Sequence, residues 1–72
     1  MRVTELTKIL AARGATMIRQ RGSHQRWKAS RDGITAYTTV AMPGMRSGDI
    51  PQGTLRQIEQ QMEPVLGKGW LR

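Results

Sequence analysis

Apolar residues near the start of the chain recur at the spacing of one helix face, at Leu6, Ile9 and Leu10. Thr4 precedes this stripe and can cap a helix. Gly14 follows the stripe and tolerates the left-handed backbone that often ends a helix. The pattern therefore predicts a first helix over residues 4–13.

The central part of the chain changes to the character of β-strands. Residues 16–20 mix β-branched and polar side chains and stop before Gly22, which predicts a short first strand. A second strand is expected over 24–30, because polar and apolar positions alternate there. The Asp-Gly pair at 32–33 is a hairpin turn signal, so we expect a third strand over 34–42.

Strand parity divides the side chains of the second predicted strand into two sets. Trp27 belongs to one set, together with Gln25 and Ala29, and is expected to face the core. The other set points away from the core and consists of His24, Arg26 and Lys28.

The last third of the chain begins with the breaker-rich segment 43–49, which predicts a loop. Leu55, Ile58 and Met62 then mark a second amphipathic helix, which Pro64 cannot continue far. We assign residues 64–72 to a C-terminal tail in which Trp70 either anchors a partner or closes the core.

The predicted order is α-β-β-β-α, and a chain of 72 residues is short enough to form one domain. The fold class is α+β, in two layers: a three-stranded antiparallel sheet with both helices on one face. The opposite face of the sheet is left free for function.

The charge of the chain favours a polyanionic partner. Twelve Lys and Arg stand against five Asp and Glu, and the net charge is +7. Cationic side chains bind nucleic acids by releasing counterions from the phosphates, so nucleic acid is the expected partner. The sequence holds neither a membrane span nor a signal-peptide core, which predicts a cytoplasmic protein with no membrane partner.

The chain has one histidine and no cysteine, so neither a metal centre nor another cofactor is expected. Histidine is the side-chain type that most readily exchanges a proton near neutral pH. His24 lies in a stretch from Leu6 to Arg31 that contains no Asp or Glu. Within this stretch the basic residues are Lys8, Arg13, Arg19, Arg21, Arg26, Lys28 and Arg31. His24 is therefore the leading candidate for proton transfer on a bound polyanion.

Three short motifs occur in a recognisable order. Gly22-Ser23-His24 opens a strand with an aromatic residue three positions later, Thr39-Val40 ends the next strand, and Ile50-Pro51-Gln52-Gly53-Thr54-Leu55 opens the last helix. With these motifs, residues 4–62 resemble the HicA toxins. That family comprises small mRNA interferases with an α-β-β-β-α fold like a double-stranded RNA-binding domain, encoded beside a HicB antitoxin.

The resemblance implies a toxin of a type II toxin–antitoxin system that cleaves mRNA and is neutralised by a HicB-like antitoxin. The catalytic histidine of the family's Gly-Ser-His motif falls on His24. Many members have a second histidine directly afterwards, where this chain has Gln25.

The predicted reaction is metal-independent, with His24 as the general base that removes the proton of a 2′-OH. The cationic side chains and turn amides beside His24 are expected to bind RNA: Arg21, Gly22, Ser23, Arg26 and Lys28.

Two other functions fit the same residues. A non-catalytic RNA-binding module would use the same cationic face and agrees with the lack of a second histidine. A protein-interaction domain would use that face to bind an acidic partner.

Overall fold

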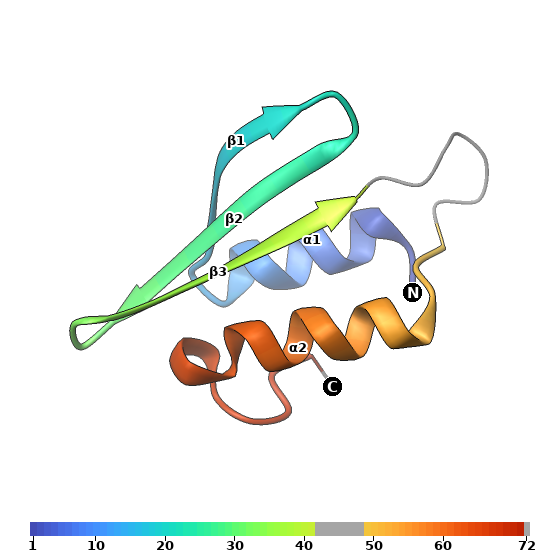
Figure 1. Cartoon of the computed structure of the whole chain (residues 1–72). Helices are drawn as coiled ribbons and strands as arrows, with labels where there is room; N and C mark the ends of the chain where they lie inside the picture. Colours follow the sequence, from blue (N-terminus) through green and yellow to red (C-terminus); the bar gives the residue numbers. More distant parts are fainter. Residues whose placement is uncertain (42–48, 72) are drawn as a thin grey trace.

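The computed structural model describes residues 1–41 and 49–71 (Figure 1). Its elements follow the predicted order: α1 (Val3–Ala12), β1 (Thr16–Arg21), β2 (His24–Arg31), β3 (Ile34–Ala41) and α2 (Gln52–Leu66). Met42, the predicted end of the third strand, and residues 43–48 of the predicted loop lie outside the described residues. The α+β fold class is confirmed.

The three strands form an antiparallel sheet in the order β1-β2-β3. A two-residue turn joins β2 to β3, and both of its residues have positive φ, 53° at Asp32 and 80° at Gly33. This backbone is that of a type I′ turn, whose twist matches the twist of the flanking strands. The turn sets the register, which runs from Arg31 opposite Ile34 to His24 opposite Ala41 without a shift.

Helix α1 begins one residue before the predicted start. Its N-cap is Arg2 rather than Thr4, and the Glu5 carboxylate accepts a hydrogen bond of 3.0 Å from the Arg2 backbone N–H. The prediction of a Thr4 cap was wrong because Val3 is buried in the core, and the helix already begins at this residue. The predicted end is confirmed: Gly14 has φ 95°, and the Ala15 N–H donates to the Leu10 carbonyl over 2.9 Å.

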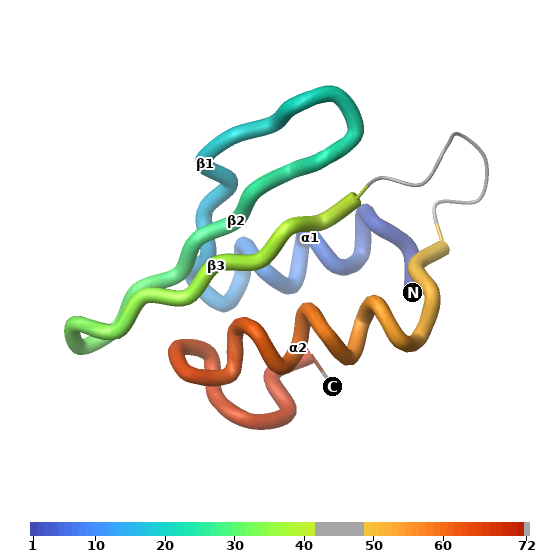
Figure 2. The backbone as a smooth tube through the Cα atoms, in the orientation of Figure 1, coloured from blue at the N-terminus to red at the C-terminus, as the bar shows by residue number. Residues whose placement is uncertain are grey.

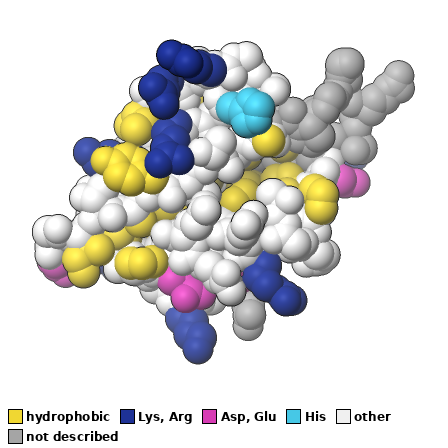
Figure 3. Space-filling view, viewed as in Figure 1, with side chains coloured by type: hydrophobic (Ala, Val, Ile, Leu, Met, Phe, Trp, Pro, Cys, Tyr) yellow, Lys and Arg dark blue, Asp and Glu magenta, His cyan; other side chains and the backbone are white. Residues whose placement is uncertain are grey.

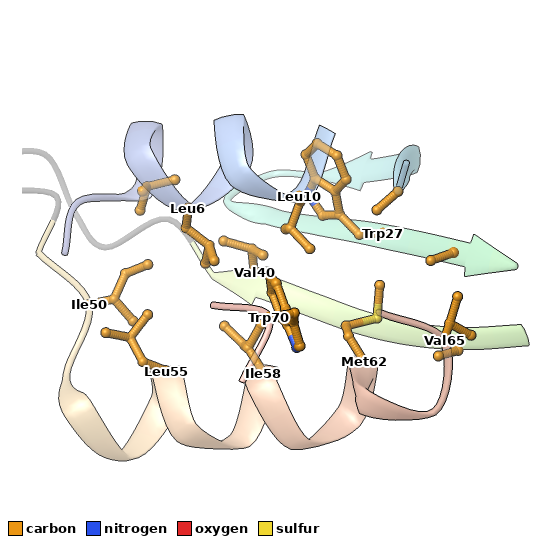
Figure 4. Packing of buried hydrophobic residues seen from close by; sticks show 14 residues of the cluster. Leu6, Leu10, Trp27, Val40, Ile50, Leu55, Ile58, Met62, Val65 and Trp70 are labelled. Atoms are coloured by element: carbon orange, nitrogen blue, oxygen red, sulfur yellow. The ribbon is translucent and has the colours of Figure 1, made fainter. Parts of the chain in front are cut away.

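Both helices cover the same face of the sheet, and the core fills the space between the layers (Figure 4). Leu6 and Leu10 of α1 and Val40 of β3 are fully buried, as is Met62 of α2. The buried Thr38 hydroxyl donates to the Gln61 Oε1 over 2.7 Å and so joins the sheet to α2. This packing leaves the second face of the sheet uncovered by either helix.

Helix α2 continues past Pro64 to Leu66, so the tail begins at Gly67 and not at residue 64. Pro64 lacks a backbone N–H and so removes the helical hydrogen bond to the Gln60 carbonyl, but only Val65 and Leu66 follow it in the helix. Val65 is buried against the core and holds this turn in place. Gly67, with φ 92°, then ends the helix.

Trp70 closes the core. Only 3% of its surface is exposed, and its Nε1 donates to the Glu59 carbonyl over 2.8 Å. Of the two roles considered for this residue, the intramolecular one is therefore observed. The indole packs among side chains of α2 and the sheet (Figure 4).

The N-terminus lies beside the segment that leads into α2 (Figure 2). Arg2 forms an isolated antiparallel bridge with Asp49, and the Ile50 N–H donates to the Met1 carbonyl over 2.9 Å. Neither described helix has the length and apolar character needed to span a bilayer.

Candidate RNA-binding and cleavage site

The turn between β1 and β2 places the candidate catalytic histidine. Gly22 and Ser23 form a two-residue connection, with φ 55° at Gly22. Positive φ at the first turn position alone is typical of a type II′ hairpin turn, where glycine is favoured. The tight turn sets His24 directly opposite Arg21 on the neighbouring strand.

The register carries further cationic residues to the same face of the sheet. Arg26 of β2 lies opposite Arg19 of β1 and Thr39 of β3. The register of β1 shifts between Met17 and Arg19, because Ile18 is an extra residue at that point. This bulge lies further from the turn than Arg19, so Arg19 and Arg21 keep the regular alternation of side chains between the two faces. His24 and Arg26 therefore share the free face with Arg19 and Arg21.

These side chains line a small, half-open surface cavity of about 100 Å³. Its lining residues are Arg19, Arg21, His24, Arg26 and Thr39. The charged residues among them are cationic, so each arginine repels the others at close range. A bound phosphate would relieve this repulsion, which makes the cavity suited to an anion. Figure 3 shows the histidine, in cyan, and Lys and Arg side chains, in dark blue, over the strands.

Two neighbours hold the Arg26 guanidinium over the sheet. Its Nη1 donates to the Thr39 hydroxyl oxygen over 2.9 Å. Its Cζ lies 5.0 Å from the centroid of the Tyr37 ring, within the range of a cation–π contact. Because these contacts restrict the side chain before any ligand arrives, Arg26 is the best positioned cation of the cavity.

Strand parity correctly placed the site residues of β2. His24 and Lys28 are exposed and Arg26 is half-buried, whereas Trp27 has 7% of its surface exposed and belongs to the core. Lys28 shares the free face but does not line the cavity. It stands four residues from His24, about 13 Å along an extended strand, and so suits a different phosphate.

Gly22 and Ser23 lie in the exposed turn between Arg21 and His24. The Gln20 side chain donates through its Nε2 to the Gly22 carbonyl over 3.2 Å, which ties the turn to β1. The two residues adjoin the cavity but do not line it.

Three residues of this face were not among the predicted site residues: Arg19, Tyr37 and Thr39. The signal for them is the hairpin register. Counting outward from the two-residue turn at 22–23 pairs Arg19 with Arg26, and counting from the turn at 32–33 pairs Tyr37 with Lys28. The register would therefore have located all three residues from the sequence.

The described residues do not bring three His, Asp or Glu side chains together in a group that could hold a metal ion. The functional groups that line the cavity are the imidazole of the histidine, the guanidinium groups of the arginines and the Thr39 hydroxyl.

Comparison with protein families agrees with the fold and the motifs. The family model described as HicA toxin of bacterial toxin-antitoxin matches residues 3–63. The chain belongs to this family. No curated protein and no solved structure matches the chain. The matched range nearly coincides with residues 4–62, where the motifs resemble HicA toxins. As a HicA toxin, the protein is one member of a toxin–antitoxin pair, so an antitoxin is its partner.

Proposed function

We propose that this HicA toxin is an endoribonuclease that cleaves mRNA without a metal ion, with His24 as the general base. The observation that supports the proposal is the cavity that His24 shares with three arginines on the free face of the sheet. A base and several cations in one small cavity are what RNA self-cleavage requires, because the nucleophile belongs to the RNA itself. We also propose a cytoplasmic location, where mRNA is available as a substrate.

In the proposed reaction, a neutral nitrogen of His24 accepts the proton of the 2′-OH. The 2′ oxygen then forms a bond to the adjacent phosphorus, and the bond from phosphorus to the 5′ oxygen breaks. The products are a 2′,3′-cyclic phosphate and a 5′-OH. The 5′ oxygen takes its proton from the protonated imidazole, from a cation or from water, since the described residues that line the cavity include no second histidine and no carboxylate.

The arginines stabilise the charge that develops on the phosphate oxygens. Arg26 is the first choice for this role, because Thr39 and Tyr37 orient it before substrate binds. Arg19 and Arg21 approach from the opposite strand, so the phosphate is held between two strands. Lys28 binds a phosphate further along the RNA, and the Gly22 and Ser23 amides contact the backbone at the turn.

The direct test is incubation of purified protein with a defined RNA, followed by identification of the new ends. We expect His24→Ala to lower the cleavage rate by about 10²- to 10⁴-fold, the usual contribution of a general base. EDTA should leave the rate unchanged. Expression of the wild type should arrest growth, whereas the variant should not.

A matched control is Lys68→Gln, which changes an exposed cation in the turns that follow α2 and should cleave like the wild type. His24 is also exposed, so the urea midpoint of His24→Ala should equal that of the wild type. Full cleavage by a folded His24→Ala protein would refute the assignment. RNA binding without cleavage by the wild type would instead indicate the non-catalytic module.

The antitoxin is proposed to be HicB-like and to neutralise the toxin by covering the cationic face. Complementary charge would speed its association and exclude RNA. Adding such an antitoxin should stop cleavage, and Arg19→Gln or Arg26→Gln should weaken the complex more than Lys68→Gln. Equal weakening by all three would place the antitoxin elsewhere.

A further inference from the structure

An aromatic ring stands exposed on the free face of the sheet, close to the cavity. Tyr37 is the fourth residue of β3 and keeps 43% of its surface exposed. Its neighbours in β3, Ala36 and Thr38, face the core and are buried. Parity therefore sets the tyrosine on the same face as Thr39, which lines the cavity.

Cations flank this ring. Lys28 lies directly opposite Tyr37 in the register, and the Arg26 guanidinium lies over one face of the ring, with its Cζ 5.0 Å from the centroid, so an incoming base would stack on the opposite face. An exposed aromatic ring between cations is the arrangement by which proteins bind single-stranded nucleic acid: the cations bind the backbone, and a base stacks on the ring. A duplex offers no such base, because its bases already stack on each other.

The distance to the cavity suits one extended strand of RNA. Tyr37 is two residues from Thr39, which is about 6.6 Å along β3. An RNA whose phosphate occupies the cavity at His24 would pass next over Tyr37 if it followed the sheet towards Lys28.

We propose that Tyr37 is a nucleobase subsite on which the base of an unpaired nucleotide stacks, beside the phosphate held at His24. The inference rests on the proposed function, and it adds that the substrate is single-stranded on this side of the cleaved bond. The subsite recognises any base by its flat face, so it supplies affinity and register with little sequence preference.

The test measures binding in a His24→Ala background, so that the RNA stays intact. Two ligands are compared: a short unstructured RNA and an oligomer of the same length and charge that lacks all bases. Tyr37→Leu should weaken binding of the RNA by about tenfold, a typical effect of losing one stacked base. The affinity for the abasic oligomer should fall much less, because there the substitution removes only the cation–π contact that helps to orient Arg26.

Two control variants separate stacking from other effects. Tyr37→Phe keeps the ring and should bind both ligands like the parent. Ile34→Ala removes another exposed apolar side chain from the same strand, 49% exposed, and should also bind like the parent.

Each alternative outcome is informative. If Tyr37→Leu binds RNA as tightly as the parent, the subsite is refuted while the proposed function stands. An equal loss for both ligands would mean that Tyr37 acts only by orienting Arg26, which also refutes the subsite. If the parent protein binds no RNA at all, the proposed function fails together with the subsite.

Discussion

Thr38 and Thr39 are neighbours in β3 whose hydroxyl groups serve different faces of the sheet. The Thr38 hydroxyl is buried and bonds to Gln61 of α2 over 2.7 Å. The Thr39 hydroxyl is exposed and accepts a hydrogen bond of 2.9 Å from Arg26. At the scale of single residues, Thr38 therefore contributes to the stability of the core, whereas Thr39 positions a side chain of the site.

Thr38→Val is expected to lower the free energy of unfolding by about 0.5–1.5 kcal/mol, because a buried hydrogen bond is lost while the volume is kept. RNA cleavage by the folded variant should be unchanged. Urea unfolding measures the first effect, and a cleavage assay at a temperature where the variant is folded measures the second.

Thr39→Val should give the opposite result. The Arg26 guanidinium loses its partner on β3, and we expect cleavage to slow by about two- to tenfold, the worth of one ordinary hydrogen bond. The urea midpoint should stay near that of the wild type, because the side chain is exposed. A large loss of stability with normal cleavage would contradict the assignment of Thr39 to the site.

At the scale of elements, the site depends on one hairpin. The turn at 22–23 joins β1 to β2 and sets Arg21 opposite His24, and the same register brings Arg19 opposite Arg26. Helix α2, in contrast, contributes to the core and supplies no lining residue of the cavity. A change in the turn should therefore disturb both stability and site, whereas a change at the exposed start of α2 should alter stability alone.

Gly22→Ala and Gly53→Ala test this difference with the same added methyl group. A Cβ at either position meets no atom within 4 Å, so only backbone preference decides the outcome. Gly22 has φ 55°, and alanine there should cost about 1–2 kcal/mol of stability. Gly53 lies in the first turn of α2, where alanine should add about 0.5–1 kcal/mol.

For both glycine variants, urea unfolding measures the stability and an RNA cleavage assay measures the activity. Gly22→Ala should also reduce cleavage, because the turn orients His24 and Arg21. Stabilisation by both substitutions, or normal cleavage by Gly22→Ala, would show that the turn does not position the site.

At the scale of the whole molecule, the sheet separates a packed face from a charged one. The helices cover one face, while the free face displays three arginines at the cavity and Lys28 beyond it. Figure 3 shows Lys and Arg side chains over the strands. This cluster favours the approach of a polyanion to the free face, although other exposed cations, such as Lys8, Arg56 and Lys68, lie on or after the helices.

Such a face predicts a defined dependence of RNA binding on salt. Three arginines at one phosphate and Lys28 at a second phosphate of a single strand would give a slope of about −1.4 for log K against log [salt]. Replacing Lys28 with glutamine should reduce the magnitude of the slope by about 0.7, whereas Lys68→Gln should leave it unchanged. Binding titrations of the His24→Ala protein between 50 and 200 mM salt measure these slopes. A slope that is the same in all variants would exclude this face as the RNA surface.

Much of the fold could be predicted from local patterns. The helical stripe at Leu6 and Leu10, the left-handed Gly14 and the Asp32-Gly33 turn each express a preference of a few neighbouring residues, and each is confirmed. Packing outweighs local preference at two of the boundaries that differ from the prediction. Burial of Val3 starts α1 early, and burial of Val65 keeps the last turn of α2 helical beyond Pro64.

For the site, the sequence by itself determined which face carries His24, Arg26 and Lys28, because side-chain alternation is a property of the strand alone. The hairpin register could also have placed Arg19 and Thr39 beside Arg26, but only the tertiary structure decided that these side chains line one cavity with His24. It also decided that Trp70 belongs to the core, since a tail without periodicity reveals its contacts only once the helices and the sheet have packed.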